Sequence, residues 1–202
     1  MGNWGVHVLD DVRNNIFRDE VALPQRIIGG GGRMAYDDAG QTPNVHFVYF
    51  DTGTIPVVIG LSNLPAEPGS KKSAAHPGPN SGYVVYGTEG YLHGQRQSAQ
   101  AFDADGNSIA KFKGNGDVKH QSNFIEAVKA EDASILNADI QVGHDSTGWC
   151  NLANIAFRSG QAIAPEDLGR VSLPQWTELI DQTEQHLAAH GLSFQSEGMQ
   201  LS

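Results

Sequence analysis

The stretch VHFVYFDTGTIPVVIGL, residues 45–61, decides the fold class. Residues 45–50 and 55–61 are rich in β-branched and aromatic side chains, which favour extended strands. The DTGT sequence at residues 51–54 separates them, and its aspartate and glycine tolerate the backbone of a tight turn. The stretch therefore predicts two antiparallel strands joined by a short turn.

Strands of similar composition are expected elsewhere in the first two thirds of the chain. They fall at residues 25–28, 83–86, 91–95, 98–102 and 108–112. The sequence DADGN at residues 103–107 predicts a second tight turn. Residues 65–82 contain four prolines and no periodicity, so we expect a long exposed loop there.

Helical spacing of apolar residues appears at the start of the chain and again in its last third. It predicts helices over residues 4–17, 118–130, 142–158 and 174–190, with Gly160 ending the third and Pro174 opening the fourth. Strands followed by helices indicate an α+β fold. We expect residues 1–202 to form a single domain with a large, mainly antiparallel open β-sheet and helices packed on one face.

Composition excludes several classes of function. The 13 basic and 23 acidic residues among 202 leave a formal net charge of −10, which argues against binding nucleic acid or an anionic membrane. No apolar stretch approaches the roughly 18 residues of a membrane span. Cys150 is the single cysteine, and no H-E-x-x-H sequence occurs, so we expect neither an intramolecular disulfide nor a metal site.

A possible dinucleotide fingerprint starts at Gly30. Residues 30–35 satisfy the G-x-G-x-x-A pattern, and Asp51 follows about 20 residues later, where a ribose-binding acid belongs. That pattern requires a helix between the glycines and the next strand. Gly40 and Pro43 interrupt the interval, so a glycine-rich strand end or bulge is the favoured interpretation.

Candidate chemistry lies in the opening helix. His7 is three residues from Asp10 and four from Asp11, and Asn3 precedes it by one helical turn, so these side chains are expected on one face. A carboxylate beside an imidazole can hold it in one tautomer, as a general acid or base requires. The alternative is a solvated helix face carrying a charge-paired histidine.

Several segments resemble the Gfo/Idh/MocA family, which includes glucose-fructose oxidoreductase and inositol dehydrogenase. They keep the order of that family over most of residues 2–160. The segments are GNWGVHVLD (2–10), GRMAYDDAGQTPN (32–44), GTEG (87–90), HQSNFIEAV (120–128), GHDST (143–147) and NLANIAFR (151–158).

The resemblance implies an NAD(P)-dependent oxidoreductase acting on a sugar, cyclitol or related polyol. On this resemblance we expect the chain to correspond to the substrate and oligomerisation domain, without the N-terminal Rossmann domain of the family. NAD or NADP would then be bound mainly by the missing domain, and the isolated chain is expected to bind no cofactor. His7 takes the position of the catalytic histidine of the family. Asn3 stands where many members have aspartate, so a charged partner for His7 must come from Asp10 or Asp11, or be lacking.

Polar side chains elsewhere are candidates for binding sugar hydroxyls. Those in residues 36–44 suit either a sugar or a hydrogen-bonded turn, and His120 suits either a sugar or the capping of local backbone. The candidates are Tyr36, Gln41, Asn44, His120, Asn123 and His144.

Two other functions remain open on the sequence. One is an NAD-dependent glycoside hydrolase of the same superfamily, and the other is a non-catalytic binding or oligomerisation module. Strands that are apolar on both faces predict a homodimer or higher oligomer through a sheet face, with a sugar-like small molecule as the other partner. A cytoplasmic location is expected, and an export signal is left open because the family's N-terminal domain is missing.

Overall fold

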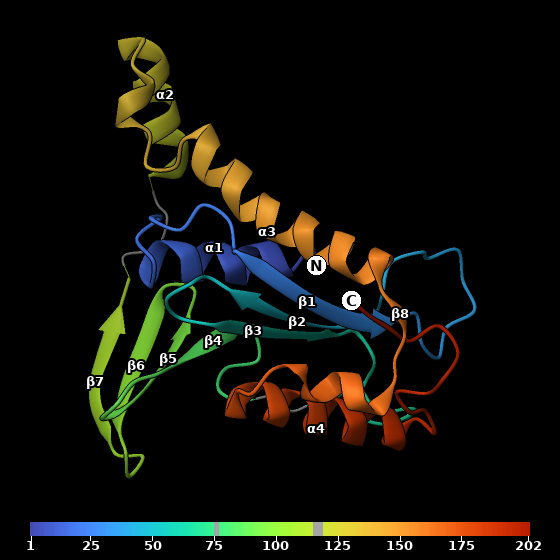
Figure 1. Ribbon diagram of the computed structural model, residues 1–202. Helices are drawn as coiled ribbons and strands as arrows, with labels where there is room; N and C mark the ends of the chain where they lie inside the picture. Colours follow the sequence, from blue (N-terminus) through green and yellow to red (C-terminus); the bar gives the residue numbers. More distant parts are fainter. Residues whose placement is uncertain (75–76, 115–118) are drawn as a thin grey trace. The chain divides into compact units, whose positions relative to one another are not determined.

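The computed structural model describes residues 1–74, 77–114 and 119–202 (Figure 1). The chain divides into two compact units. Unit 1 comprises Met1–Gly5, Leu23–Ala75 and Gly148–Ser202, and unit 2 comprises Val6–Ala22 and His76–Thr147. Each unit has its own antiparallel sheet, so the two are described separately.

The sheet of unit 1 is built around the strand pair expected from residues 45–61. Its strand order is β3-β2-β1-β9-β8, and every pairing is antiparallel. The strands are β1 (Arg26–Gly32), β2 (Val45–Asp51), β3 (Val57–Ser62), β8 (Gln161–Ala162) and β9 (Gln200–Leu201). In the turn between β2 and β3, Gly53 has a φ of 77° and donates its N–H to Asp51 Oδ1 at 3.0 Å. The expected hairpin is therefore confirmed.

The glycine run that resembled a dinucleotide fingerprint lies inside β1. Gly30 is opposite Phe47, and a Cβ at Gly30 would lie 2.5 Å from that ring. A Cβ at Gly31 would lie 2.2 Å from the Val45 carbonyl oxygen. Residues 33–44 contain no helix. The glycines are needed because β2 packs closely here, which agrees with the strand interpretation.

Helices cover both faces of the sheet in unit 1, whereas one covered face was expected. On one face, Trp176 of α4 (Pro174–Ala189) packs against Phe47, with ring centroids 5.8 Å apart. On the other, Trp149 of α3 (Ile140–Ser159) packs against Phe50 at 5.0 Å. Successive residues of β2 point to opposite faces and nearly all are apolar, so each face requires a cover.

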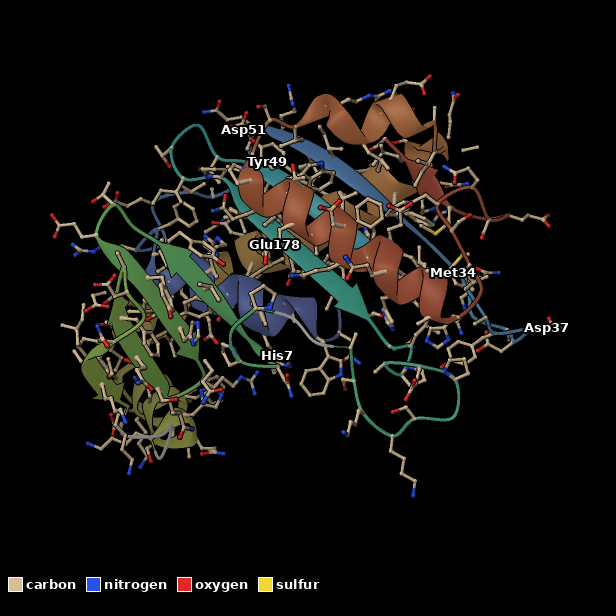
Figure 2. The ribbon with its side chains drawn as sticks, turned by 90° about the horizontal axis from the view of Figure 1, so that it is seen from below. His7, Met34, Asp37, Tyr49, Asp51 and Glu178 are labelled. Carbon is tan, nitrogen blue, oxygen red and sulfur yellow. The ribbon has the colours of Figure 1, made fainter. Side chains whose placement is uncertain are left out.

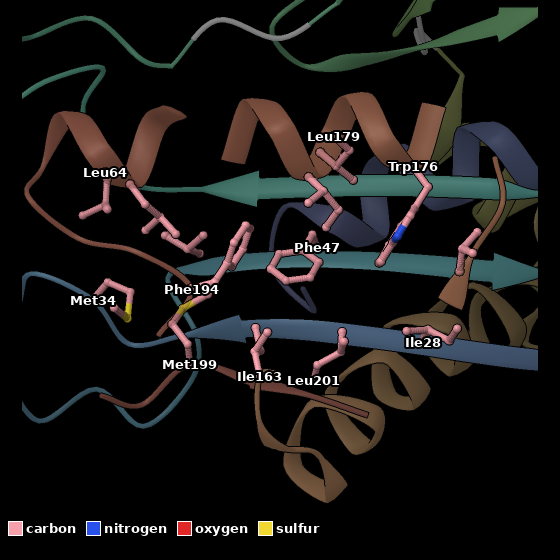
Figure 3. Close-up of a cluster of buried hydrophobic side chains, with 14 residues drawn as sticks. Ile28, Met34, Phe47, Leu64, Ile163, Trp176, Leu179, Phe194, Met199 and Leu201 are labelled. Carbon is pink, nitrogen blue, oxygen red and sulfur yellow. The ribbon is translucent and has the colours of Figure 1, made fainter. Parts of the chain in front are cut away.

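The main core of unit 1 lies between α4 and the sheet (Figure 3). Apolar residues recur on α4 at helical spacing and meet the strands and the segment after α4. The buried cluster comprises Ile28, Met34, Val45, Phe47, Leu64, Ile163, Val171, Trp176, Leu179, Ile180, Leu187, Phe194, Met199 and Leu201.

The sheet of unit 2 is a four-stranded meander. Its strands β4 (Gly82–Tyr86), β5 (Gly90–Gln95), β6 (Ser98–Asp103) and β7 (Ser108–Lys113) pair antiparallel in sequence order. The turn before β7 is closed by Asp103, whose Oδ1 accepts the N–H groups of Asp105 at 3.0 Å and Asn107 at 2.8 Å. The second expected hairpin is thus confirmed.

The helices agree with the expected positions. They are α1 (Gly5–Asn15), α2 (His120–Ala130), α3 and α4. The first expected residue of the second helix, Val118, lies outside the described residues. Asp139 Oδ1 accepts the N–H groups of Gln141 and Val142, which starts α3 two residues before the expected position. No helix in the described ranges is long and apolar enough to cross a membrane.

The α+β class is confirmed, and so is the antiparallel arrangement. The strands form two sheets rather than one large sheet. The short elements β8, β9, η1 (Ala133–Ile135) and η2 (Pro165–Arg170) were not expected, because an element of two to six residues is too short to show a readable periodicity.

Candidate functional site

Helix α1 divides into a buried face and a face that carries the candidate chemistry. Leu9 and Val12 are buried, while His7 is exposed and Asp10 and Asp11 are half-buried. Figure 2 shows His7 on this helix. Helical spacing alone produces this division, so the expected placement of His7 beside the two aspartates is reproduced in unit 2.

A buried arginine connects α1 to the first half of α3 within unit 2. Arg13 is 0% exposed, and its Nη1 donates to Ser146 Oγ at 2.7 Å and to the Val142 carbonyl at 3.1 Å. Its Nη2 lies 3.4 Å from Asp145 Oδ2. A buried guanidinium needs partners for its donors, and these contacts supply them.

Ser146 also forms a hydrogen bond with Asp10. Its Oγ donates to Asp10 Oδ1 at 2.6 Å while accepting from Arg13. The three side chains of this hydrogen-bonded chain, Arg13–Ser146–Asp10, therefore hold one another in place. The Asp10 carboxylate is positioned by α3 and is not simply a solvated group on the helix surface.

Asp11 has an unusual electrostatic environment. Burial raises the pKa of its carboxyl, and the neighbouring Asp10 raises it further. Arg96 and His7 act in the opposite direction and lower the pKa, but the net result is a raised pKa. Burial also raises the pKa of Tyr83, with Asp11 adding to the effect and a hydrogen bond with the Asn15 side chain opposing it. Asp11 is therefore the carboxylate whose titration responds to His7. A half-buried carboxyl with a raised pKa beside an exposed imidazole is suited to proton exchange.

Asn3 lies outside the helix. Residues 2–4 form a turn, and α1 begins at Gly5, whose N–H donates to the Met1 carbonyl at 2.8 Å. The expected helical alignment of Asn3 with His7 assumed an earlier start. Its exposed amide therefore belongs to the entry of the helix and not to its first turn.

Three other candidates of unit 2 lie on α2 and α3. His120 and His144 are exposed. Asn123 instead supports the local backbone, since its Nδ2 donates to the Ile135 carbonyl at 2.8 Å and its Oδ1 accepts the Asn137 N–H at 2.9 Å. Asn123 thus closes the turn after α2, although nothing in its spacing indicated that role.

The candidates of unit 1 lie between β1 and β2. Asn44 is buried, and its side chain accepts the Met34 N–H at 2.7 Å and donates to the Met34 carbonyl at 2.9 Å. This is the hydrogen-bonded turn that the sequence offered as the alternative to sugar binding. Tyr36 is 43% exposed with Arg33 over its ring, and Gln41 is exposed, so these two side chains are accessible.

The glycine run at residues 30–35 does not form a nucleotide-binding loop. The space beside Gly30 and Gly31 is occupied by residues of β2. No group of three or more His, Cys, Asp or Glu side chains in the described ranges is arranged to hold a metal ion. Burial raises the pKa of the Cys150 thiol to about 11, which removes it as a nucleophile at neutral pH.

Sequence reasoning missed Arg13, Asp145 and Ser146. The cue was present in α1, where Arg13 follows Leu9 by one turn and therefore points toward the buried face. Its partners on α3 lie more than 120 residues away, however, at 129, 132 and 133 positions along the chain. No local pattern connects residues so distant.

No protein-family model and no curated protein sequence matches this chain. Several solved structures align with it, and two of them are described as follows. One, a protein of Klebsiella pneumoniae provisionally described as an oxidoreductase, is 15% identical with a TM-score of 0.49, over 89% of this chain and 52% of its own. The other, yhhX, also provisionally described as an oxidoreductase, is 8% identical with a TM-score of 0.43, over 74% and 46%. The chain spans about half the length of each, and the proposed function rests on its own residues instead.

Proposed function

We propose that this chain provides the acid–base helix of an oxidoreductase that acts on a sugar, cyclitol or related polyol, with His7 as the proton-exchanging group. The observation that carries the proposal is the construction of α1. It exposes an imidazole next to Asp11, a carboxyl with a raised pKa, while the chain Arg13–Ser146–Asp10 holds the following turn in place. The motif resemblance around residues 2–10 supports the same assignment.

The proposal concerns the proton, because the glycine run at residues 30–35 packs against β2 and leaves no room for the pyrophosphate of a nicotinamide nucleotide. That cofactor, NAD or NADP, would be bound by a domain outside these 202 residues and would supply the redox step. The neutral imidazole of His7 accepts the proton of a substrate hydroxyl. Asp11 stabilises the imidazolium that results, and Asp10 keeps the helix turn oriented through Ser146.

The full-length gene product tests this function by turnover of polyols with NAD or NADP. His7→Ala is expected to lower kcat by about 10² to 10⁴, the usual contribution of a positioned general acid or base. Asn14→Ala is the matched control, since Asn14 is an exposed residue of α1 that contacts Asp19. Asn3→Asp should be tolerated.

Three results would oppose the proposal. Unchanged turnover in His7→Ala would return His7 to a solvated helix face. Calorimetric titration of the 202-residue chain with NAD should show no site tighter than about 1 mM, near −4 kcal/mol. A stoichiometric NAD site tighter than this limit would show that the chain binds the nucleotide by itself. Absence of turnover by the full-length product would favour the alternative of a non-catalytic binding module.

A further inference from the structure

A hollow of about 720 Å³ lies in unit 2 over β5, β6 and β7, bordered by Gly78 and Pro79 of the preceding loop. None of the acid–base residues His7, Asp10 and Asp11 lines it, although Arg96 at its border interacts with the Asp11 carboxyl. Two rows of side chains cross these strands within it. The strand register places Ser98 opposite both Gln95 and Lys113, and Gln100 opposite both His93 and Lys111. Side chains directly opposite each other in a sheet lie on the same face, so each row presents its polar groups together.

The charge of this hollow is opposite to that of the chain. Arg96, Lys111 and Lys113 line it, and none of the described lining residues is acidic. The whole chain has a net charge of −10, so this local excess of cations does not follow from composition. Arg96 also interacts with the Asp11 carboxylate, whereas Lys111 and Lys113 have no ion pair in the described part of the chain. A cleft lined by one sign of charge attracts ligands of the other sign.

The neutral groups of the hollow suit hydroxyls. Gln95 Nε2 donates to Ser98 Oγ at 3.0 Å, and Gln100 Nε2 donates to Ser108 Oγ at 3.0 Å. Both bonds use the amide nitrogen and fix the orientation of the side chain. The amide oxygens are then the acceptors offered to a ligand hydroxyl, and His93 lies in the same row as Gln100.

Protection of a sheet edge explains only part of this arrangement. Strand β7 is one of the two edge strands of the four-stranded sheet, and lysines on an edge strand discourage pairing with another chain. That role requires Lys111 and Lys113 alone. It accounts neither for Arg96 in the turn between β5 and β6 nor for the oriented amides across three strands.

We propose that this hollow binds a small polyhydroxylated anion, a sugar phosphate or a sugar acid, with Lys111 and Lys113 contacting the anionic group and Gln95 and Gln100 contacting hydroxyls. The anionic group could be phosphate or carboxylate, because an ammonium group binds either as a point charge. The site does not depend on His7 or on a nucleotide.

Isothermal titration of the 202-residue chain with four probes tests the proposal. The probes are glucose 6-phosphate, gluconate, inorganic phosphate and glucose. At least one of the first two should bind, more tightly than inorganic phosphate and than uncharged glucose, and the tighter of the two identifies the acid group. The double variant K111Q/K113Q should bind it at least about tenfold more weakly, which corresponds to about 1.4 kcal/mol.

The double variant K71Q/K72Q is the matched control, because it removes two exposed lysines that do not line the hollow. It should bind like the wild type, and so should His7→Ala, which separates this site from the proposed function. Urea unfolding of each variant checks that it is folded. The proposal is overturned if neither glucose 6-phosphate nor gluconate binds below about 10 mM, near −3 kcal/mol. Equal binding of glucose or of inorganic phosphate, or wild-type binding by K111Q/K113Q, would overturn it as well.

Discussion

Replacement of His46 by phenylalanine tests how burial in unit 1 sets the acid sensitivity of the protein. His46 lies on β2, is 1% exposed, and has its ring 5.8 Å from that of Phe157. Neither ring nitrogen of His46 has hydrogen-bond geometry with a described residue. The Ala153 backbone acts to raise the pKa of His46, against the larger effect of burial. Burial lowers the pKa of His46 from 6.5 to about 4.

The size and sign of the effect follow from proton linkage. Below pH 6.5 the unfolded chain binds a proton at residue 46, which the folded chain does not accept until about pH 4. The free energy of unfolding therefore falls as pH decreases through this window. A difference of about 2.5 pKa units corresponds to about 3 kcal/mol. His46→Phe cannot bind that proton in either state and should lose less stability on acidification.

Urea unfolding at pH 7 and pH 4, followed by the fluorescence of buried Trp149 and Trp176, measures the effect. Hydrogen bonds lower the pKa of Asp38, Asp103 and Asp132, so these carboxyls also reduce stability in acid. Wild type and variant share them, and the comparison removes their contribution. His144→Gln, at an exposed position of α3, is the control. Equal acid sensitivity of wild type and His46→Phe would refute the reasoning.

Two further predictions concern unit 2. Arg13→Met should lower the free energy of unfolding, measured with urea, by about 3 to 5 kcal/mol, because Asp145 then loses its buried cationic partner. A loss below about 1 kcal/mol would show that the contact is dispensable. Helices α3 and α4 cover both faces of the sheet whose apolar strands led us to expect a homo-oligomer, so that sheet offers no free face for it. We therefore expect the interface at the aromatic end of the four-stranded sheet, where Tyr91 stacks on Phe102 at 4.9 Å and Tyr86 is 50% exposed. Sedimentation of the chain at micromolar concentration should show a homo-oligomer. A single species at 21.6 kDa would contradict this.

Local chemistry in the sequence was sufficient to predict most individual elements. The apolar runs on either side of residues 51–54 and the aspartate-glycine turn at residues 103–107 led to the correct hairpins. Gly40 and Pro43 correctly argued against a helix after Gly32. The spacing of His7, Asp10 and Asp11 placed them correctly on one helix. These features depend on neighbours within a few residues, so their signals are visible in the sequence.

The tertiary structure decided which of those elements meet. Division of the strands into two sheets, and the second helical cover on the sheet of unit 1, depend on pairings between distant segments. The same is true of the candidate site, where Ser146 reaches Asp10 from 136 residues away and Arg13 finds its buried partners on α3. Periodicity reports which face of an element is apolar, but it does not say which partner covers that face. Burial and hydrogen-bond satisfaction select the partner only when the whole chain is packed.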